Sequence, residues 1–248
     1  MAQIGRRVAE MHLALASDDE LPDFAPEPTG PADVQRWIED VIDRAERVFD
    51  TLRQRRDTIK EADRALVDQL LGESAGLRDR LATLLPTDID GLNIRHHGDF
   101  HLGQILIVKD DIFIIDFEGE PRRPLADRRR KAPAARDVAG LIRSIDYSAT
   151  AALERALKVS PDDTKLAAAL ADWRDRAAAA FLAAYRETMT HERLWPADPR
   201  AAERLLNFFL LEKAIYEIEY ELAHRPDWLR VPLMGSLRIL SLRTNEAS

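Results

Sequence analysis

The sequence has no cysteine, few glycines and no apolar run of the length that a membrane-spanning helix needs. Without cysteine, a disulfide framework and a thiolate zinc site are both excluded. The first residues, MAQIGRRVAE, also lack the apolar segment of a cleaved secretory signal. We therefore expect a cytoplasmic protein that has no membrane partner.

Positive charge is also scarce, because 36 Lys and Arg residues face 44 Asp and Glu residues and the net charge is −8. A general nucleic-acid binder presents a basic surface, so nucleic acid is not an expected partner. The densest basic segment, residues 122–131, is open to two interpretations. It is either a solvated loop that balances an acidic protein or a loop whose cations approach phosphate or an acidic partner surface.

Most of the chain has the apolar periodicity of α-helices. The predicted helices are 2–16, 33–56, 59–85 with a break near Gly72 or Gly76, 134–157, 163–190, 199–224 and 229–243. Residues 17–31 hold four prolines and are expected to form an extended loop. At 248 residues the chain is large enough to bury a full core. We predict a mainly α fold in a single domain, with one small β-hairpin and a helical part at 134–243.

The β element lies in residues 94–121, which read IRHHGDFHLGQILIVKDDIFIIDFEGEP. Residues 105–108 and 112–115 are isoleucine-rich runs separated by a polar turn, which predicts a β-hairpin. An antiparallel hairpin brings its two ends together, so polar residues just before the first strand should meet those just after the second. These residues are Asp99, Gln104, Asp116 and Glu118. Such a cluster of oxygen ligands suits Mg²⁺ shared with a phosphate.

The segment HGDFHLGQ followed by IIDFEGEP resembles the catalytic centre of aminoglycoside-phosphotransferase-like kinases, and more narrowly that of maltokinases. The later segments RDVAGLIRSIDY and LLEKAIYEIEYEL are similar to the same group, so the resemblance covers nearly the whole chain. It implies a protein-kinase-like fold and the ATP-dependent phosphorylation of maltose to maltose 1-phosphate in trehalose and glycogen metabolism. ATP is the implied co-substrate and Mg²⁺ the implied metal.

The resemblance implies a role for each polar residue of the hairpin. Asp99 would be the base that takes the proton of the acceptor hydroxyl, a task that suits a carboxylate. Gln104 and Asp116 would hold Mg²⁺, with Gln104 at a position that is usually Asn in the wider group. Glu118 would bind either the metal or a sugar hydroxyl. A plainer interpretation is that Asp99 and Asp116 are turn residues at strand ends.

Two further residues are predicted to support the catalytic loop. His97 is expected to hold the loop backbone through a hydrogen bond. Asp137 is expected to cap a helix and to anchor the same loop. The histidines at positions 96, 97 and 101 also admit a zinc-site interpretation. That interpretation is disfavoured, because their spacing falls on a loop and the sequence has no HExxH pattern.

The predicted helix 199–224 carries two distinct faces at about 100° per residue. One face is apolar and comprises Leu211, Ala214, Ile215, Ile218 and Leu222. A second stripe is polar and comprises Glu212, Tyr216 and Glu219, with Lys213 and Tyr220 beside them. Within the maltokinase resemblance this stripe implies a sugar-binding surface, where acids accept hydroxyl hydrogen bonds and rings stack on the sugar. The alternative is an exposed stripe with ordinary i,i+4 pairs.

A kinase of this type also has an N-terminal lobe with a strand-borne lysine and a loop over the phosphates. Neither a glycine-rich loop nor a β-rich region precedes the catalytic segment. The chain is therefore expected to be the C-terminal lobe alone, either cut from a kinase or at the end of a longer fusion with a trehalose synthase. Such a lobe would be weakly active or inactive, and would expose an apolar surface where the N-terminal lobe docks.

Two alternative functions remain open. In the first, the chain would be a non-catalytic module that binds maltose or assembles with a trehalose synthase. In the second, it would be a related kinase that acts on another hydroxyl compound such as an aminoglycoside or choline. The joint presence of Asp99, Gln104 and Asp116 favours an enzyme, because a scaffold does not need all three. The missing first lobe favours the module.

Overall fold

The structure is a computed structural model that describes residues 1–85, 89–121, 123–160, 163, 165–191 and 193–241. The chain divides into two compact units. Unit 1 comprises Met1–Thr29 and Asp90–Ala202, and unit 2 comprises Gly30–Ile89 and Glu203–Ser248. The described residues are mostly helical and include two two-stranded sheets, one more than the sequence predicts.

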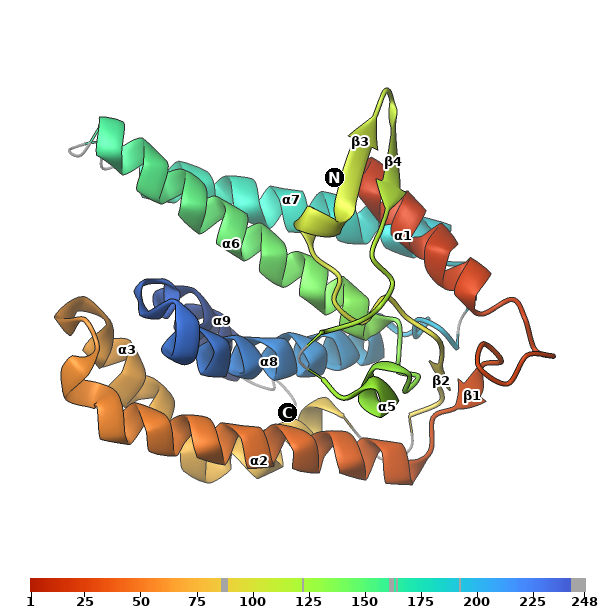
Figure 1. The fold of residues 1–248 in the computed structure, drawn as a ribbon, viewed down its shortest axis with the longest axis horizontal. Coiled ribbons are helices and arrows are strands. Elements are labelled where there is room, and N and C mark those ends of the chain that lie inside the picture. Colours follow the sequence, from red (N-terminus) through yellow and green to blue (C-terminus); the bar gives the residue numbers. More distant parts are fainter. Residues whose placement is uncertain (86–88, 122, 161–162, 164, 192, 242–248) are drawn as a thin grey trace. The chain divides into compact units, whose positions relative to one another are not determined.

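The helical part of unit 1 contains α1 (Ala2–Leu15), α6 (Ala135–Val159) and α7 (Leu166–Thr188), all close to their predicted positions (Figure 1). Helix α7 packs against both α1 and α6. Gly5 allows the close approach of α1 to α7, because a Cβ at this position would lie 2.3 Å from the Phe181 carbonyl oxygen. The approach buries apolar residues of both helices completely, and these include Val8, Ala9 and Phe181.

The predicted hairpin is confirmed as β3 (Ile105–Val108) paired antiparallel with β4 (Asp111–Ile114). Its second strand begins one residue earlier than predicted, because Lys109 adopts a positive φ of 55° and so shortens the turn to two residues. Apolar side chains of the hairpin are exposed, with 48% of Leu106, 80% of Ile107 and 59% of Phe113 accessible to solvent. The hairpin therefore carries an exposed apolar surface.

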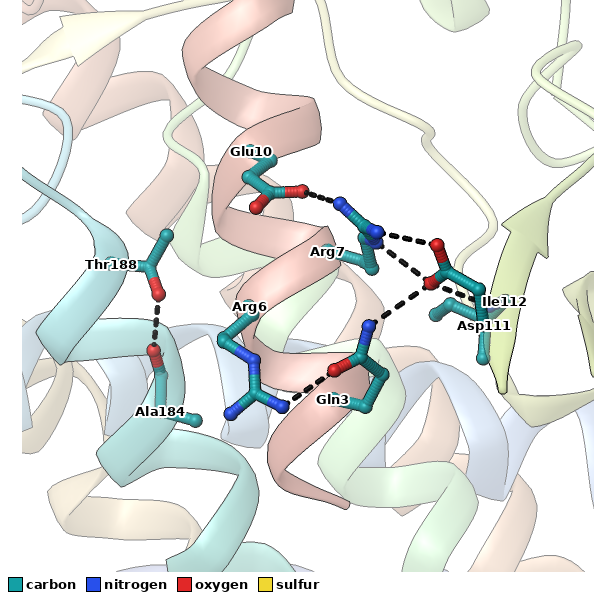
Figure 2. Close-up of polar contacts among 8 residues, drawn as sticks. All are labelled: Gln3, Arg6, Arg7, Glu10, Asp111, Ile112, Ala184 and Thr188. Carbon is teal, nitrogen blue, oxygen red and sulfur yellow. Dashed lines mark hydrogen bonds and ion pairs between the residues drawn. The ribbon is translucent and has the colours of Figure 1, made fainter.

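An ionic contact joins the hairpin to α1 (Figure 2). Arg7 donates from Nε to Asp111 Oδ1 at 2.8 Å and from its Nη2 to Asp111 Oδ2. Gln3 donates to the same Oδ1 at 3.0 Å, and Arg7 also pairs with Glu10. Hydrogen bonds from Arg7 and Gln3 hold the pKa of Asp111 well below its usual range, so the carboxylate stays ionised at neutral pH. The turn end of the hairpin is thus held against the first helix.

The second sheet pairs β1 (Glu27–Pro28), which lies in the predicted extended loop 17–31, with β2 (Leu92–Asn93), which lies just before the segment 94–121. Strands of two residues carry no readable alternation, and this explains why the sequence did not reveal them. The basic segment beside them includes a short helix, α5 (Leu125–Arg128), although this segment was predicted to be irregular. Lys131 has a structural role there, because its Nζ donates to the carbonyl oxygens of Pro22 and Ala25 at 2.6 and 2.7 Å. Arg122, in the same segment, lies outside the described residues.

Unit 2 contains the helices α2 (Pro31–Arg55), α3 (Glu61–Gly72), α4 (Leu77–Leu84) and α9 (Arg230–Ser241), and α8 (Pro199–His224) from Glu203 onward. Helix α2 begins two residues before the predicted start, because the Asp33 carboxylate accepts from the Gly30 amide at 3.0 Å and Pro31 occupies the first turn. The predicted break near Gly72 and Gly76 is confirmed by the 3₁₀ turn Ser74–Gly76.

The predicted apolar face of α8 is confirmed, because its residues are buried: Leu211, Ala214, Ile215, Ile218 and Leu222. Aromatic packing joins α8 to α2, where the rings of Trp37 and Phe209 lie 5.7 Å apart, edge to face. The last predicted helix ends at Ser241, and residues 242–248 lie outside the described part of the chain. Within the part that is described, no helix combines the length and the apolar character that a membrane crossing requires.

Candidate functional site

The two ends of the hairpin meet at Gln104 and Asp116. The side-chain amide of Gln104 donates to Asp116 Oδ2 at 3.0 Å, and the Ile115 amide donates to the Gln104 carbonyl oxygen, also at 3.0 Å. Gln104 is half-buried at the end of a 3₁₀ turn, whereas Asp116 is exposed. The structure therefore brings together the two side chains that the resemblance implies as Mg²⁺ ligands.

Gly98 and Gly119 bring the segment HGDFHLGQ into close contact with the segment IIDFEGEP. Gly98 and Gly119 adopt positive φ angles of 85° and 77°, a backbone region that favours glycine. A Cβ on Gly98 would lie 3.1 Å from the Gly119 Cα, so the contact leaves little room for a side chain. Asp116 also has a positive φ of 68°, and Asp is one of the few residues that tolerate this conformation. The backbone is thus sharply turned on both sides of the candidate site.

His97 connects the loop of Asp99 to the end of β4. Its Nε2 lies 2.8 Å from the Ile115 carbonyl oxygen, and its Nδ1 lies 3.4 Å from the Asp99 amide. One neutral tautomer satisfies both contacts, with Nε2 donating and Nδ1 accepting. This geometry is compatible with the structural role expected for His97. Asp99 itself is half-buried.

Asp137 accepts hydrogen bonds from the backbone of the same loop. Its Oδ2 accepts from the His97 amide at 2.7 Å, and its Oδ1 accepts from the Gly98 amide at 3.0 Å. Burial alone would raise the pKa of Asp137, but hydrogen bonds from His12 and from the Gly98 amide hold it well below its usual range. Asp137 is not the helix cap that the sequence predicts, because α6 begins at Ala135 and its N-cap is Ala134.

His97 and His101 have partners other than a metal. His101 Nδ1 accepts from the Gly103 amide at 3.0 Å, and both ring nitrogens of His97 contact the backbone. Burial lowers the pKa of His96 to about 4, so this ring is neutral at pH 7. Across the residues that the structure describes, no three His, Asp or Glu side chains are grouped to hold a metal ion. The zinc interpretation therefore has no support from these contacts.

Glu118 lies beside α5. Arg128 donates from Nη1 to the Glu118 carbonyl oxygen at 3.4 Å, and the same atom lies 3.7 Å from the Glu118 carboxylate. Glu118 is exposed, so its carboxylate can still exchange this partner for another ligand. Neither the metal-binding nor the sugar-binding interpretation of Glu118 is favoured by this geometry.

In unit 2, cations from α2 and α8 surround part of the predicted sugar stripe. Arg44 and Arg47 lie 3.4 and 3.8 Å from the two carboxylate oxygens of Glu219. The guanidinium of Arg44 lies 5.2 Å from the centre of the Tyr216 ring, and Lys213 Nζ lies 4.9 Å from it. The negative charge of Glu219 is therefore offset by two arginines that sequence reasoning did not associate with it.

Tyr220 also has close neighbours. Its ring stacks on His224 with the ring centres 4.6 Å apart, and the Arg225 guanidinium lies 5.2 Å from its centre. Glu212, Lys213, Tyr216, Glu219 and Tyr220 are all partly exposed. The stripe is thus reachable by solvent, but Tyr220 offers less open ring surface than the sequence suggests.

Sequence reasoning missed the groups that hold the site in place. His12 lies 3.2 Å from Asp137, although 125 residues separate them. Only one signal in the sequence points to it, a histidine placed on the otherwise apolar face of the first helix. The glycines at 98 and 119 had a clearer signal, because each stands beside an acidic residue in a short motif.

No protein-family model matches the chain. The chain is 30% identical over 245 residues to a glucosamine kinase of Streptacidiphilus jiangxiensis, and this match covers 99% of the chain and 50% of the relative. It is also 30% identical over 241 residues to a glucosamine kinase of Mycolicibacterium smegmatis, covering 92% of the chain and 50% of the relative. The chain is similar to glucosamine kinases. It spans about half the length of these curated relatives.

Solved structures of glucosamine kinases also have folds similar to that of this chain. A glucosamine kinase in complex with glucosamine, ADP and inorganic phosphate matches with a TM-score of 0.75 and 29% identity, over 96% of this chain and 51% of that chain. A second crystal form of glucosamine kinase matches with a TM-score of 0.74 and 29% identity, over 96% of this chain and 52% of that one. These relatives are glucosamine kinases, and they give no support to fusion with a trehalose synthase.

Proposed function

We propose that the chain is the catalytic part of an ATP-dependent sugar kinase and has the fold of a kinase-like C-terminal lobe. The observation that carries the proposal is the contact between Gln104 and Asp116, which closes the hairpin beside the loop of Asp99. Phosphoryl transfer depends on positioning and charge neutralisation more than on covalent chemistry. A loop held at fixed geometry and two oxygen ligands supply those requirements. The similarity to glucosamine kinases supports the same activity.

Asp99 is the proposed base, which orients the acceptor hydroxyl and takes its proton during transfer. Gln104 and Asp116 are the proposed Mg²⁺ ligands. Their donor atoms fit this ion, because Mg²⁺ takes oxygen ligands and is usually held by one or two protein groups together with waters and substrate phosphates. Gln104 turns its amide nitrogen toward Asp116 Oδ2, so it would present its amide oxygen instead to a cation held beside that carboxylate. The metal would neutralise charge on the transferred phosphate.

The acceptor has two candidates. Glucosamine is favoured by the names of the relatives and by the ligand of the solved complex. Maltose is favoured by the motif resemblance, and also by the cations around Tyr216 and Glu219, which would repel a protonated amino sugar more than a neutral one. In either case we propose that the α8 residues Glu212, Lys213, Tyr216, Glu219 and Tyr220 contact the sugar. Glu118 is proposed to contact the metal or the sugar.

The acceptor is identified by calorimetric titration of the protein with glucosamine, maltose and Mg·ATP in turn, followed by initial rates of ADP formation with each sugar. We expect one sugar to bind and to be phosphorylated with a kcat/KM at least tenfold above the other. N-Acetylglucosamine serves as the control, because it keeps the ring of glucosamine and removes the charge of the amine. Binding of neither sugar, with no sugar-dependent ADP formation, would refute the proposed function.

A further inference from the structure

A buried line of polar groups runs from α7 through α1 to the loop that carries Asp99. Tyr185 of α7 places its hydroxyl 2.9 Å from His12 Nδ1, and His12 Nε2 lies 3.2 Å from Asp137 Oδ2. Tyr185 and His12 are completely buried, and Asp137 is nearly so. Because burial of an unpaired polar group is costly, the hydrogens along this line must be arranged so that each group has a partner.

Only one neutral arrangement gives each of these atoms a partner. The Asp137 carboxylate is an acceptor, so His12 must carry its hydrogen on Nε2 and donate to Oδ2. His12 Nδ1 then bears a lone pair, which accepts the hydroxyl hydrogen of Tyr185. Burial raises the pKa of Tyr185 well above its ordinary value, so the phenol keeps that hydrogen. The other neutral tautomer would place a nitrogen lone pair against the carboxylate.

The line ends at the backbone that positions Asp99. Asp137 accepts from the amides of His97 and Gly98, and Asp99 is the next residue along the chain. Gly98 has a φ of 85°, a left-handed conformation that glycine adopts readily, so the chain turns sharply between the two amides and Asp99. A displacement of Asp137 would therefore move the peptide groups on which the Asp99 carboxylate is mounted.

We propose that His12 is a positioning residue for Asp99, and that Tyr185 donates to Nδ1 of the His12 tautomer that Asp137 requires. The positioning of Asp99 for phosphoryl transfer rests on the proposed function, whereas the anchoring of the loop does not. Neither His12 nor Tyr185 belongs to the hairpin motifs, and both reach the loop only through Asp137. Their contribution is to the geometry of the base, so it should affect turnover more than binding of the sugar.

Two substitutions of His12 separate positioning from packing. His12→Gln keeps an amide donor near the place of Nε2, so it can still donate to Asp137. His12→Asn is shorter and keeps a polar group only near the place of Nδ1, facing Tyr185. His191→Gln and His191→Asn are the matched controls, because His191 is exposed. Tyr185→Phe removes only the hydroxyl and tests its hydrogen bond to His12 Nδ1.

The first measurement is hydrogen exchange of the His97 and Gly98 amides in the protein without substrate. We expect His12→Asn to speed their exchange at least tenfold, His12→Gln to speed it much less, and both control variants to leave it unchanged. Equal acceleration in His12→Gln and His12→Asn, or none in either, would overturn the proposal. If the His12 variants do not fold, ¹⁵N NMR of the unaltered protein decides, because a His12 ring with its hydrogen on Nδ1 rather than Nε2 is incompatible with the proposed line.

The second measurement is steady-state phosphorylation of the sugar. We expect His12→Asn to lower kcat about tenfold to a hundredfold with little change in the sugar KM, and His12→Gln to restore most of the loss. A loss confined to KM would overturn the positioning role. If the unaltered protein phosphorylates neither sugar, the proposed function fails, and the exchange experiment still tests the anchoring of the loop on its own.

Discussion

Asp116 accepts a hydrogen bond of 3.0 Å from the side-chain amide of Gln104, which lies twelve residues earlier in the chain. The contact closes the mouth of the hairpin and places a carboxylate and an amide together. Around it, Gly98 contacts Gly119 and His97 contacts the Ile115 carbonyl oxygen. Both halves of the motif are therefore held together by contacts that do not depend on a ligand.

Asp116→Asn tests whether this contact marks the metal site. The substitution removes the negative charge, so the concentration of Mg²⁺ that gives half-maximal phosphorylation should rise by more than the roughly 10- to 100-fold that loss of an outer partner of a metal costs. Asp110→Asn in the exposed turn of the same hairpin is the control and should leave the Mg²⁺ requirement unchanged. An Asp116→Asn protein with the Mg²⁺ dependence of the unaltered protein would exclude Asp116 as a ligand.

Gly98→Ala tests the contact between the two motif halves. The new Cβ would meet the Gly119 Cα at 3.1 Å and would force a side chain into a positive φ, so we expect a loss of about 1–3 kcal/mol in the free energy of unfolding and a loss of activity. Gly76→Ala is the matched control, because a Cβ there meets nothing within 4 Å and its φ is −99°. Chemical denaturation measures both. A Gly98→Ala protein with an unchanged free energy of unfolding would show that the contact with Gly119 leaves room for a side chain.

Asp137→Asn should give a pH-dependent loss of stability. The pKa of Asp137 is lower in the folded protein than in the unfolded chain, so its contribution is fully present above the unfolded pKa of about 4 and is lost as the pH falls toward the folded value. At pH 7 the variant should lose about 2–4 kcal/mol in urea unfolding, because three donors then face an amide. The difference between the two proteins should stay constant from pH 7 to 5 and shrink below pH 4. A difference that does not change with pH would mean that the charge of Asp137 is not what stabilises the fold.

Tyr216→Ala tests the proposed sugar stripe of α8. Loss of the ring should raise the KM for the sugar about tenfold or more, while Tyr216→Phe should keep most of the affinity because the ring face remains. Trp173→Ala on α7 is the control, since it also removes a partly exposed aromatic ring. A sugar KM that stays within twofold in Tyr216→Ala would remove this residue from the binding surface.

Local patterns in the sequence were sufficient for the long helices and the hairpin, but not for the one-turn helix α5. Apolar spacing locates α1 and the buried face of α8, and two isoleucine-rich runs locate β3 and β4, because each of these signals lies within a few residues. The meeting of Gln104 and Asp116 follows from the hairpin itself. These are the parts of the site that short-range physics determines.

Contacts between distant segments could not be predicted in this way. Arg44 and Glu219 belong to different helices, and a charge pattern on one helix does not indicate which helix will pack against it. His12 and Asp137 are likewise joined only by the packing of α1 on the rest of unit 1. The strands β1 and β2 are too short to leave a pattern. One histidine on an apolar helix face was the sole local sign of the buried line.

The rate of phosphoryl transfer by the Asp99→Asn variant tests the central claim most directly. Mg·ATP and the preferred sugar should give sugar-dependent ADP formation, and Asp99→Asn should lower kcat about 10²- to 10⁴-fold with little change in the sugar KM. Asp110→Asn should behave like the unaltered protein. An Asp99→Asn protein that retains kcat within a few-fold of the unaltered protein, or an unaltered protein without sugar-dependent ADP formation, would contradict the assignment of this loop as the catalytic centre of a sugar kinase.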